Sequence, residues 1–222
     1  MATDAAPDDA SIKIVPYDGS WPARFAAEQR LLEQAVGAWA TGGIHHVGST
    51  AVPGLAAKPI IDILVGVEDL EAARACFDRL MKLGYKYAPY RAQEMHWFCK
   101  PDPRHRTHHL HLVPSNSGRY AAELAFRDAL CRRSDLAERY AMLKLALARA
   151  YGLDRDGYSE AKSAFIADVL REVPMMGASP RVPSTSVEIR AVRPGSSGHR
   201  PCSAVNPAGC RGFEHADDGT GA

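Results

Sequence analysis

The sequence lacks the features that would place it in a membrane or outside the cell. Its five cysteines are an odd number and include no Cys-x-x-Cys pair, which argues against a disulfide framework and for a reducing compartment. No apolar run approaches the roughly 20 residues that cross a bilayer. The acidic start of small residues has neither the basic nor the apolar region of a signal peptide. We therefore expect a cytoplasmic protein without a membrane partner.

The sequence also lacks an excess of charge of one sign. It has 27 Lys+Arg and 26 Asp+Glu, a formal net charge of +1, and no basic stripe. This balance argues against a nucleic-acid partner. A local basic cluster remains compatible with binding a nucleotide or another phosphorylated small molecule.

Composition divides the chain into three parts. Residues 1–10 are predicted to be a disordered leader, and residues 11–172 carry nearly all of the periodic apolar pattern of a folded domain. Residues 173–222 are rich in Pro, Ser, Gly and Arg and are predicted to be a disordered tail. One domain with one tail is the simplest organisation.

The periodic part predicts an α/β (α+β) fold, a small mixed β-sheet covered by helices with a helical C-terminal part. A helix capped by Ser20 is expected to run to the Thr41-Gly42-Gly43 segment. Strands are predicted at 12–15, 44–47, 59–65, 85–90, 94–99 and 107–113. Further helices are predicted at 69–83, 119–132, 135–151 and 159–171.

The segment from Gly48 to Asp62 is the most informative part of the sequence. Gly48-Ser49-Thr50 follows a predicted strand, and such a turn exposes N–H and hydroxyl groups that can hold phosphate. Lys58 adds a positive charge for the same anion. Asp62 interrupts an otherwise apolar strand, where a carboxylate is costly unless it is paired or binds a metal. Asp62 is therefore a candidate functional residue, although it could also serve only to brace the glycine turn.

The chain resembles the GrpB family. The matching segments are Val15-Pro16-Tyr17 with Trp21 and Phe25, the run 46–63, His108-His109-Leu110-His111-Leu112, Phe126-Arg127-Asp128, Tyr140 with Leu143-Lys144, and Tyr158 with Lys162. They cover residues 11–172 in order and spacing. The resemblance implies a nucleotidyltransferase-like fold, and a domain of this kind also occurs fused behind some bacterial dephospho-CoA kinases.

The nucleotidyltransferase superfamily is similar in placing two acids at positions i and i+2 of a strand after the Gly-Ser turn. Such acids project from one face and together hold Mg²⁺ ions that bridge nucleotide phosphates. Here Asp62 occupies the first position, but the second is Leu64, which cannot bind a metal. The usual two-metal site is therefore in doubt, and with it enzymatic activity.

Histidines are candidates to complete a metal site. His109 and His111 share one face of a predicted strand, and His96 lies in another strand with Glu94 on the same face. If these strands flank Asp62, the cluster suits Zn²⁺ or Mn²⁺, with Mg²⁺ as the ion that the fold implies. The histidines could instead bond each other, phosphate or backbone carbonyls.

Three basic residues, Arg127, Lys144 and Lys162, lie one in each predicted C-terminal helix among apolar neighbours. An Arg with two ammonium groups suits a phosphorylated ligand. The alternative is surface pairing with Asp128, Glu138 or Glu160.

Two functions follow from these residues. The first is a nucleotidyltransferase-like enzyme that binds a nucleotide or phosphorylated small molecule and transfers a nucleotidyl or phosphoryl group, with catalysis assigned to Asp62, His109 and His111. The second is a non-catalytic ligand-binding or accessory domain linked to coenzyme A metabolism, which Leu64 favours. A divalent metal is the expected cofactor of the first.

Overall fold

The computed structural model describes residues 12–172. The predicted disordered leader, 1–10, and tail, 173–222, lie outside the described residues. Within the described part, no helix combines the length and apolar character needed to cross a membrane.

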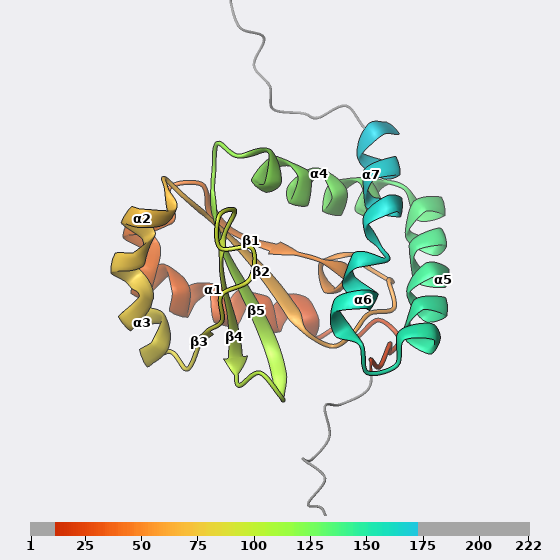
Figure 1. Cartoon of the computed structure of the whole chain (residues 1–222), viewed down its shortest axis with the longest axis horizontal. Coiled ribbons are helices and arrows are strands. Elements are labelled where there is room, and N and C mark those ends of the chain that lie inside the picture. The colour runs from red at the N-terminus through yellow and green to blue at the C-terminus, as the bar shows by residue number, and fades with distance from the viewer. Residues whose placement is uncertain (1–11, 173–222) are drawn as a thin grey trace, which may run out of the picture. The chain divides into compact units, whose positions relative to one another are not determined.

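A single five-stranded sheet forms the centre of this part (Figure 1). Its strands, in spatial order, are β1 (Gly43–Val47), β2 (Ile61–Val67), β5 (Arg106–Pro114), β4 (His96–Pro101) and β3 (Lys86–Tyr87). β2 and β5 are parallel and the other neighbours are antiparallel. The predicted mixed sheet is confirmed. The long apolar run of β2 is explained by its place between two strands, with both faces covered.

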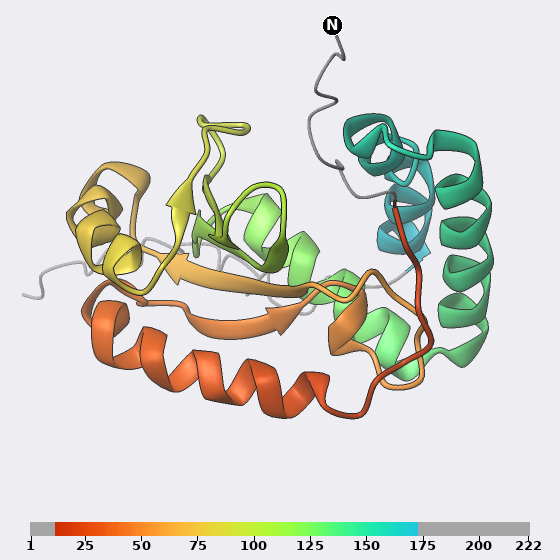
Figure 2. The ribbon, with the colours of Figure 1, turned by 90° about the horizontal axis from the view of Figure 1, so that it is seen from below.

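One face of the sheet carries the main core. Alternate residues of β2, including Ile61, Ile63 and Val65, are buried there against α1 (Trp21–Val36). Pro22 lies in the first turn of α1, where its missing N–H costs no hydrogen bond. After α1 the chain continues as a short 3₁₀ turn, η1 (Gly37–Trp39). The same face of the sheet is also covered by α2 (Leu70–Ala73), η3 (Arg74–Cys76) and α3 (Phe77–Lys82). Figure 2 shows α1 lying along β1 and β2.

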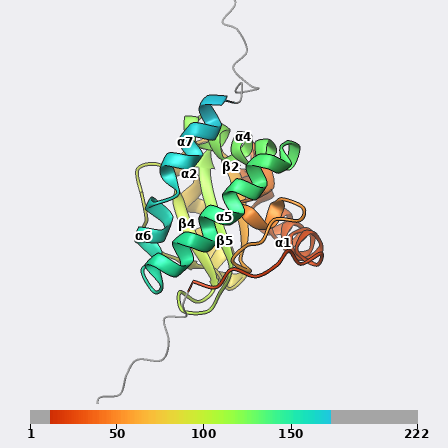
Figure 3. The same cartoon turned by 90° about the vertical axis from the view of Figure 1, so that its right-hand side faces the viewer.

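The opposite face meets α4 (Gly118–Arg132), whose Tyr120 and Leu124 pack on Val47, Leu64 and Val113. Three further helices, α5 (Ser134–Tyr151), α6 (Arg155–Glu160) and α7 (Ser163–Glu172), gather beyond one end of the strands (Figures 2 and 3). This is the predicted helical C-terminal part. It places α5 and α6 beside the start of β2.

Four predicted elements differ from the structure. Residues 12–15 form one isolated bridge, Val15 to Ala57, because Pro59 lacks the N–H for a next pair with Lys13, and on the other side the N–H of Leu55 donates to Val52. The helix predicted at 69–83 is divided into α2, η3 and α3. The strand predicted at 85–90 ends at Tyr87, before a turn in which Arg91 has a φ of 48°. The last predicted helix is divided into α6 and α7.

Candidate functional site

Asp62 lies directly against the glycine turn. It pairs with Val47 across β1 and β2, one residue before Gly48. Gly48 has a φ of 68°, and a Cβ at this position would overlap Oδ2 of Asp62 and lie 3.0 Å from its Cγ. The position therefore requires glycine for both its backbone angle and its space. A 3₁₀ turn, η2 (Ser49–Ala51), follows and covers the start of β2.

Parallel pairing of β2 with β5 brings His109 beside Asp62, with Oδ1 of Asp62 2.8 Å from Nδ1 of His109. His111 is two residues further along the same face. One ligand atom from each of these three residues lies within 4.8 Å of the other two. The structure thus brings together the three residues that the sequence assigned to a metal and to catalysis.

The charges of Asp62 and His109 follow from this contact. Burial acts to raise the pKa of Asp62, but the hydrogen bond to His109 and the nearby cations outweigh it, so the pKa lies below its usual value. Burial lowers the pKa of His109 despite the carboxylate. An ionised Asp62 can only accept hydrogen bonds. Neutral His109 therefore donates a hydrogen bond from Nδ1 to Asp62 and carries its lone pair on Nε2. That Nε2 is buried and has no hydrogen-bond partner among residues 12–172.

His111 faces a second carboxylate, which the sequence did not single out. Its Nδ1 lies 3.4 Å from Oε2 of Glu123 on α4. Burial acts to lower the pKa of His111, but the charge of Glu123 outweighs this effect, so the pKa lies above its usual value. Burial acts to raise the pKa of Glu123, but the charge of His111 outweighs this effect, so the pKa lies below its usual value. Each partner therefore favours the charged form of the other, and a metal bound to His111 would compete with its imidazole proton.

His96 is not part of this cluster, which corrects the fourth predicted metal ligand. In β4, Trp97 pairs with His111 and His96 with Leu112, so His96 points to the opposite face of the sheet. Its ring is buried there, with Nε2 2.7 Å from the carbonyl oxygen of Leu70. Glu94 lies before β4 and pairs with Arg119.

Leu64 occupies the position where a second metal-binding carboxylate would stand. It is fully buried and packs with Val47, Met95 and Val113. The i+2 position thus belongs to an apolar cluster under α4. The donors that remain are one carboxylate and two imidazoles, a set that suits Zn²⁺ or Mn²⁺ better than Mg²⁺.

Three lysines from separate segments surround Asp62, and each interacts electrostatically with it. Burial lowers the pKa of Lys144 to about 7 and that of Lys162 to about 8. Burial and the charges of Arg155 and Arg106 lower that of Lys58 to about 8. Such crowded ammonium groups are stabilised by an anion.

The lysines are held by the surrounding helices. Nζ of Lys144, on α5, donates to the carbonyl oxygen of Ala56 at 2.5 Å and lies 4.8 Å from the centre of the Tyr140 ring. Nζ of Lys162 lies 4.1 Å from the centre of the Tyr158 ring. Arg106 and Arg155, which the sequence analysis missed, add charge beside Lys58. No local pattern distinguished them from surface arginines.

Ser49 and Thr50 have different surroundings. The side chain of Ser49 is hydrogen-bonded to Tyr140, and Tyr140 also interacts electrostatically with Asp62. Thr50 is buried, and its hydroxyl donates to the carbonyl oxygen of Ile60 at 3.2 Å while lying 3.0 Å from Nε2 of His46. Thr50 therefore braces the turn, which corrects its predicted role as a ligand-binding residue.

Arg127 also has a bracing role in the structure. Its Nη1 donates to the carbonyl oxygen of His46 at 3.1 Å, and its Nε donates to Asp128 at 2.7 Å. The bond to His46 attaches α4 to β1, whereas the bond to Asp128 lies within α4. The sequence left two roles open for Arg127, ligand binding or pairing with Asp128, and the structure shows the pairing with Asp128.

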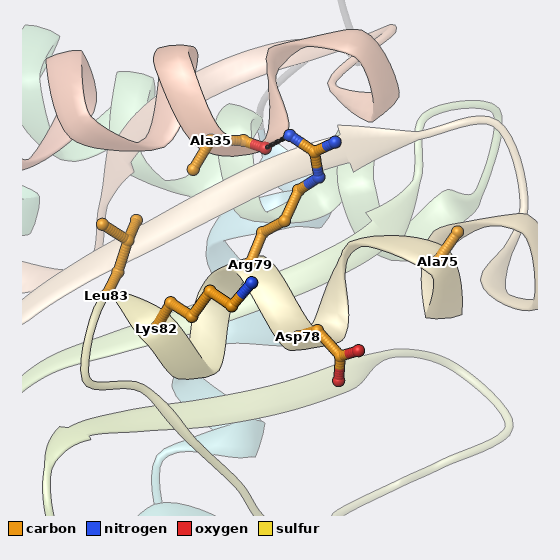
Figure 4. Close-up of a pocket in the computed structure, with 6 residues that line it drawn as sticks. All are labelled: Ala35, Ala75, Asp78, Arg79, Lys82 and Leu83. Atoms are coloured by element: carbon orange, nitrogen blue, oxygen red, sulfur yellow. Dashed lines mark hydrogen bonds between the residues drawn. The ribbon is translucent and has the colours of Figure 1, made fainter.

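A separate hollow of about 570 Å³ lies between the end of α1 and α3 (Figure 4). Its lining includes Ala35, Arg79 and Lys82. Arg79 donates across it to the carbonyl oxygen of Ala35 at 3.5 Å. The hollow shares no residue with the cluster around Asp62.

Comparison with known proteins gives consistent matches. The profile described as GrpB protein matches residues 11–172. A UPF0157 protein of Pseudomonas aeruginosa is 40% identical over 168 residues, which cover 73% of this chain and 68% of that protein. The crystal structure of the conserved protein GrpB from Enterococcus faecalis matches with a TM-score of 0.64 and 34% identity, covering 72% of this chain and 96% of that one. A dephospho-CoA kinase of Mycolicibacterium paratuberculosis is 38% identical over 98 residues, 43% of this chain and 23% of that protein. The chain belongs to the GrpB family.

Proposed function

We propose that the chain binds a phosphorylated small molecule, a nucleotide in the first place, at Asp62, with one divalent cation held by Asp62, His109 and His111. The observation that carries this proposal is that three lysines, Lys144 buried and Lys58 and Lys162 half-buried, interact electrostatically with one carboxylate. Lys58, Lys144 and Lys162 would hold the phosphate oxygens, and the Gly48-Ser49 turn would add N–H and hydroxyl donors.

The donor set supports the cation. Oδ1 of Asp62 and Nδ1 of His109 are 2.8 Å apart, so a metal held by both would take the place of the proton between them. When bound, the ion would supply positive charge against the phosphate. The side chains would orient the ligand and keep its phosphate among fixed donors.

Transfer of a nucleotidyl or phosphoryl group is the finer form of this proposal. The nucleotidyltransferase-like fold implied by the resemblance favours it. The buried Leu64 removes the second carboxylate, so transfer would depend on one ion and on the lysines. The alternative is a binding or accessory domain linked to coenzyme A metabolism, which the partial match to a dephospho-CoA kinase supports.

Thermal unfolding and calorimetry test the proposal with ATP, CTP, GTP, dephospho-CoA and inorganic phosphate, each with Mg²⁺, Mn²⁺ or Zn²⁺ and without metal. A ligand at 100 times its dissociation constant should raise the free energy of unfolding by about 2.7 kcal/mol. Asp62→Asn should remove the part of the stabilisation that depends on metal. If no phosphorylated probe stabilises the protein at millimolar concentration, the proposal is wrong.

A single-turnover assay separates transfer from binding. The probe that binds is radiolabelled on its phosphates and incubated with the metal that supports binding. Label transferred or released by the wild type, and not by Asp62→Asn, supports the enzyme. Tight binding with no turnover supports the accessory domain.

A further inference from the structure

The two histidines of β5 each meet a carboxylate from a different element. His109 contacts Asp62 of β2 through Nδ1 at 2.8 Å, and His111 contacts Glu123 of α4 through Nδ1 at 3.4 Å. Both rings are thus approached by a carboxylate at the same nitrogen. With Nδ1 of His111 facing Glu123, Nε2 is the ring nitrogen of His111 that could bind a metal.

Glu123 is itself held in place. Its Oε1 lies 3.0 Å from Nε of Arg119, four residues earlier on α4. Nη1 of Arg119 donates to Glu94 at 2.8 Å. A chain of charged contacts therefore runs from Glu94, just before β4, through α4 to the imidazole of His111. The side chain of Glu123 is about four-fifths buried, with 20% relative exposure, so its contact with His111 is little screened by solvent.

We propose that Glu123 is a positioning residue for His111, and that this carboxylate-backed imidazole together with His109 makes the cluster a site for Zn²⁺ rather than Mg²⁺. The inference rests on the proposed metal site and deepens it. Imidazole nitrogen is a preferred ligand of zinc, whereas Mg²⁺ selects oxygen donors and retains its water. A carboxylate behind a ligating histidine fixes the ring and strengthens the nitrogen as a donor.

A purely structural explanation exists for the same contact. Glu123 and His111 could simply attach α4 to β5 as an ion pair. In that case the loss of Glu123 would lower stability and leave the metal affinity of the folded protein unchanged. Metal affinity and the spectrum of a bound ion therefore distinguish the two roles.

The test uses the full chain without any phosphorylated ligand. Zn²⁺ and Mg²⁺ are titrated separately by calorimetry, with a competing chelator for zinc. Zinc should bind the wild type at least 100-fold more tightly than magnesium. Glu123→Gln should weaken zinc binding by about 10- to 100-fold, the usual effect of removing such an outer partner.

Asp128→Asn is the matched control, because Asp128 lies on the same helix and pairs with Arg127 instead of a histidine. It should leave zinc affinity within twofold of the wild type. Co²⁺ provides a spectroscopic readout, since its visible absorption reports the ligand geometry. The Co²⁺ spectrum should change in Glu123→Gln and not in Asp128→Asn.

Should Glu123→Gln fail to fold, Glu123→Asp retains the charge but shortens the side chain, and it should also weaken zinc binding and alter the Co²⁺ spectrum. Equal zinc affinity in a folded Glu123 variant and the wild type would overturn the positioning role. Equal affinity of the wild type for zinc and magnesium would overturn the metal assignment. Neither result would remove phosphate binding by the lysines, so failure here is distinguishable from failure of the proposed function.

Discussion

Oδ1 of Asp62 lies 2.8 Å from Nδ1 of His109, although the two residues are 47 positions apart in the sequence. The contact arises because β5 inserts between β2 and β4 and pairs with β2 in parallel. Asp62 is the second residue of β2, and the register sets His109 directly opposite it. They therefore face the end of the sheet that α5 and α6 cover, where the lysines gather.

The contact between Gly48 and Asp62 gives the first prediction. In Gly48→Ala the new Cβ would overlap the carboxylate and lie 3.0 Å from its Cγ. The positive φ adds a further penalty for a residue with a side chain, about 1 kcal/mol. We expect a loss of about 2–3 kcal/mol in the free energy of unfolding, because steric overlap in a packed site adds to this penalty. Urea denaturation measures it.

Gly54→Ala is the control for this prediction. Gly54 has a φ of 77°, but a Cβ there would meet no atom within 4 Å. It should cost only the backbone penalty of about 1 kcal/mol and leave ligand binding intact. Equal losses in the two variants would show that the contact with Asp62 contributes nothing.

The parts of the site that the sequence predicted are those that a local pattern determines. The period of two in β5 placed His109 and His111 on one face, and the apolar run around Asp62 indicated a covered strand. Neither pattern gives the order of strands in a sheet. Glu123, on a helix packed against that face, therefore went undetected, and His96 was assigned to the wrong face. Its orientation depends on the register of β4 against β5.

The second prediction concerns the other face of the sheet. Lys100 of β4 donates to both carboxylate oxygens of Glu28 on α1, at 2.8 and 3.0 Å. Glu28→Gln would leave the ammonium without its charged partner. We expect a loss of about 2 kcal/mol, below the usual cost of breaking a buried pair because Lys100 is partly exposed.

Chemical denaturation measures this loss, and a ligand titration serves as its control. The pair lies on the face opposite Asp62, so the folded Glu28→Gln protein should bind phosphorylated probes and zinc as the wild type does. The double variant Glu28→Met, Lys100→Met should recover most of the stability, because no unpaired charge remains. A double variant as unstable as the single one would contradict the explanation.

The third prediction is a pH dependence caused by Lys144. Its pKa is about 7 in the folded protein, against 10.5 for the free side chain. Between these values the unfolded chain holds a proton that the folded chain does not, so this group makes stability rise as pH increases from about 7 to 10.5. Lys144→Met should flatten the rise by at most about 1.4 kcal/mol per pH unit, the value for one proton.

Urea denaturation at four pH values from 7 to 10 provides the comparison. Tyrosines and cysteines titrate in the same range, but they are common to both proteins and cancel in the difference. The gap between variant and wild type should therefore change steadily with pH. Parallel stability profiles would show that Lys144 keeps its ordinary proton affinity in the folded state.

The last prediction concerns the ligand itself. Lys162 carries a pKa of about 8 beside Asp62, so it is mostly neutral at pH 9, where a bound phosphate should restore its proton and draw protons from the buffer. Lys162→Met should weaken binding of the best phosphorylated probe by about tenfold at pH 7, equivalent to about 1.4 kcal/mol, and reduce the proton uptake at pH 9. Calorimetry in buffers of different ionisation enthalpy measures both. Lys82→Met, in the separate hollow of Figure 4, is the control and should change neither. Because the two substitutions remove the same charge from the chain, equal weakening in both would mean that the probe responds to net charge and not to the lysines around Asp62.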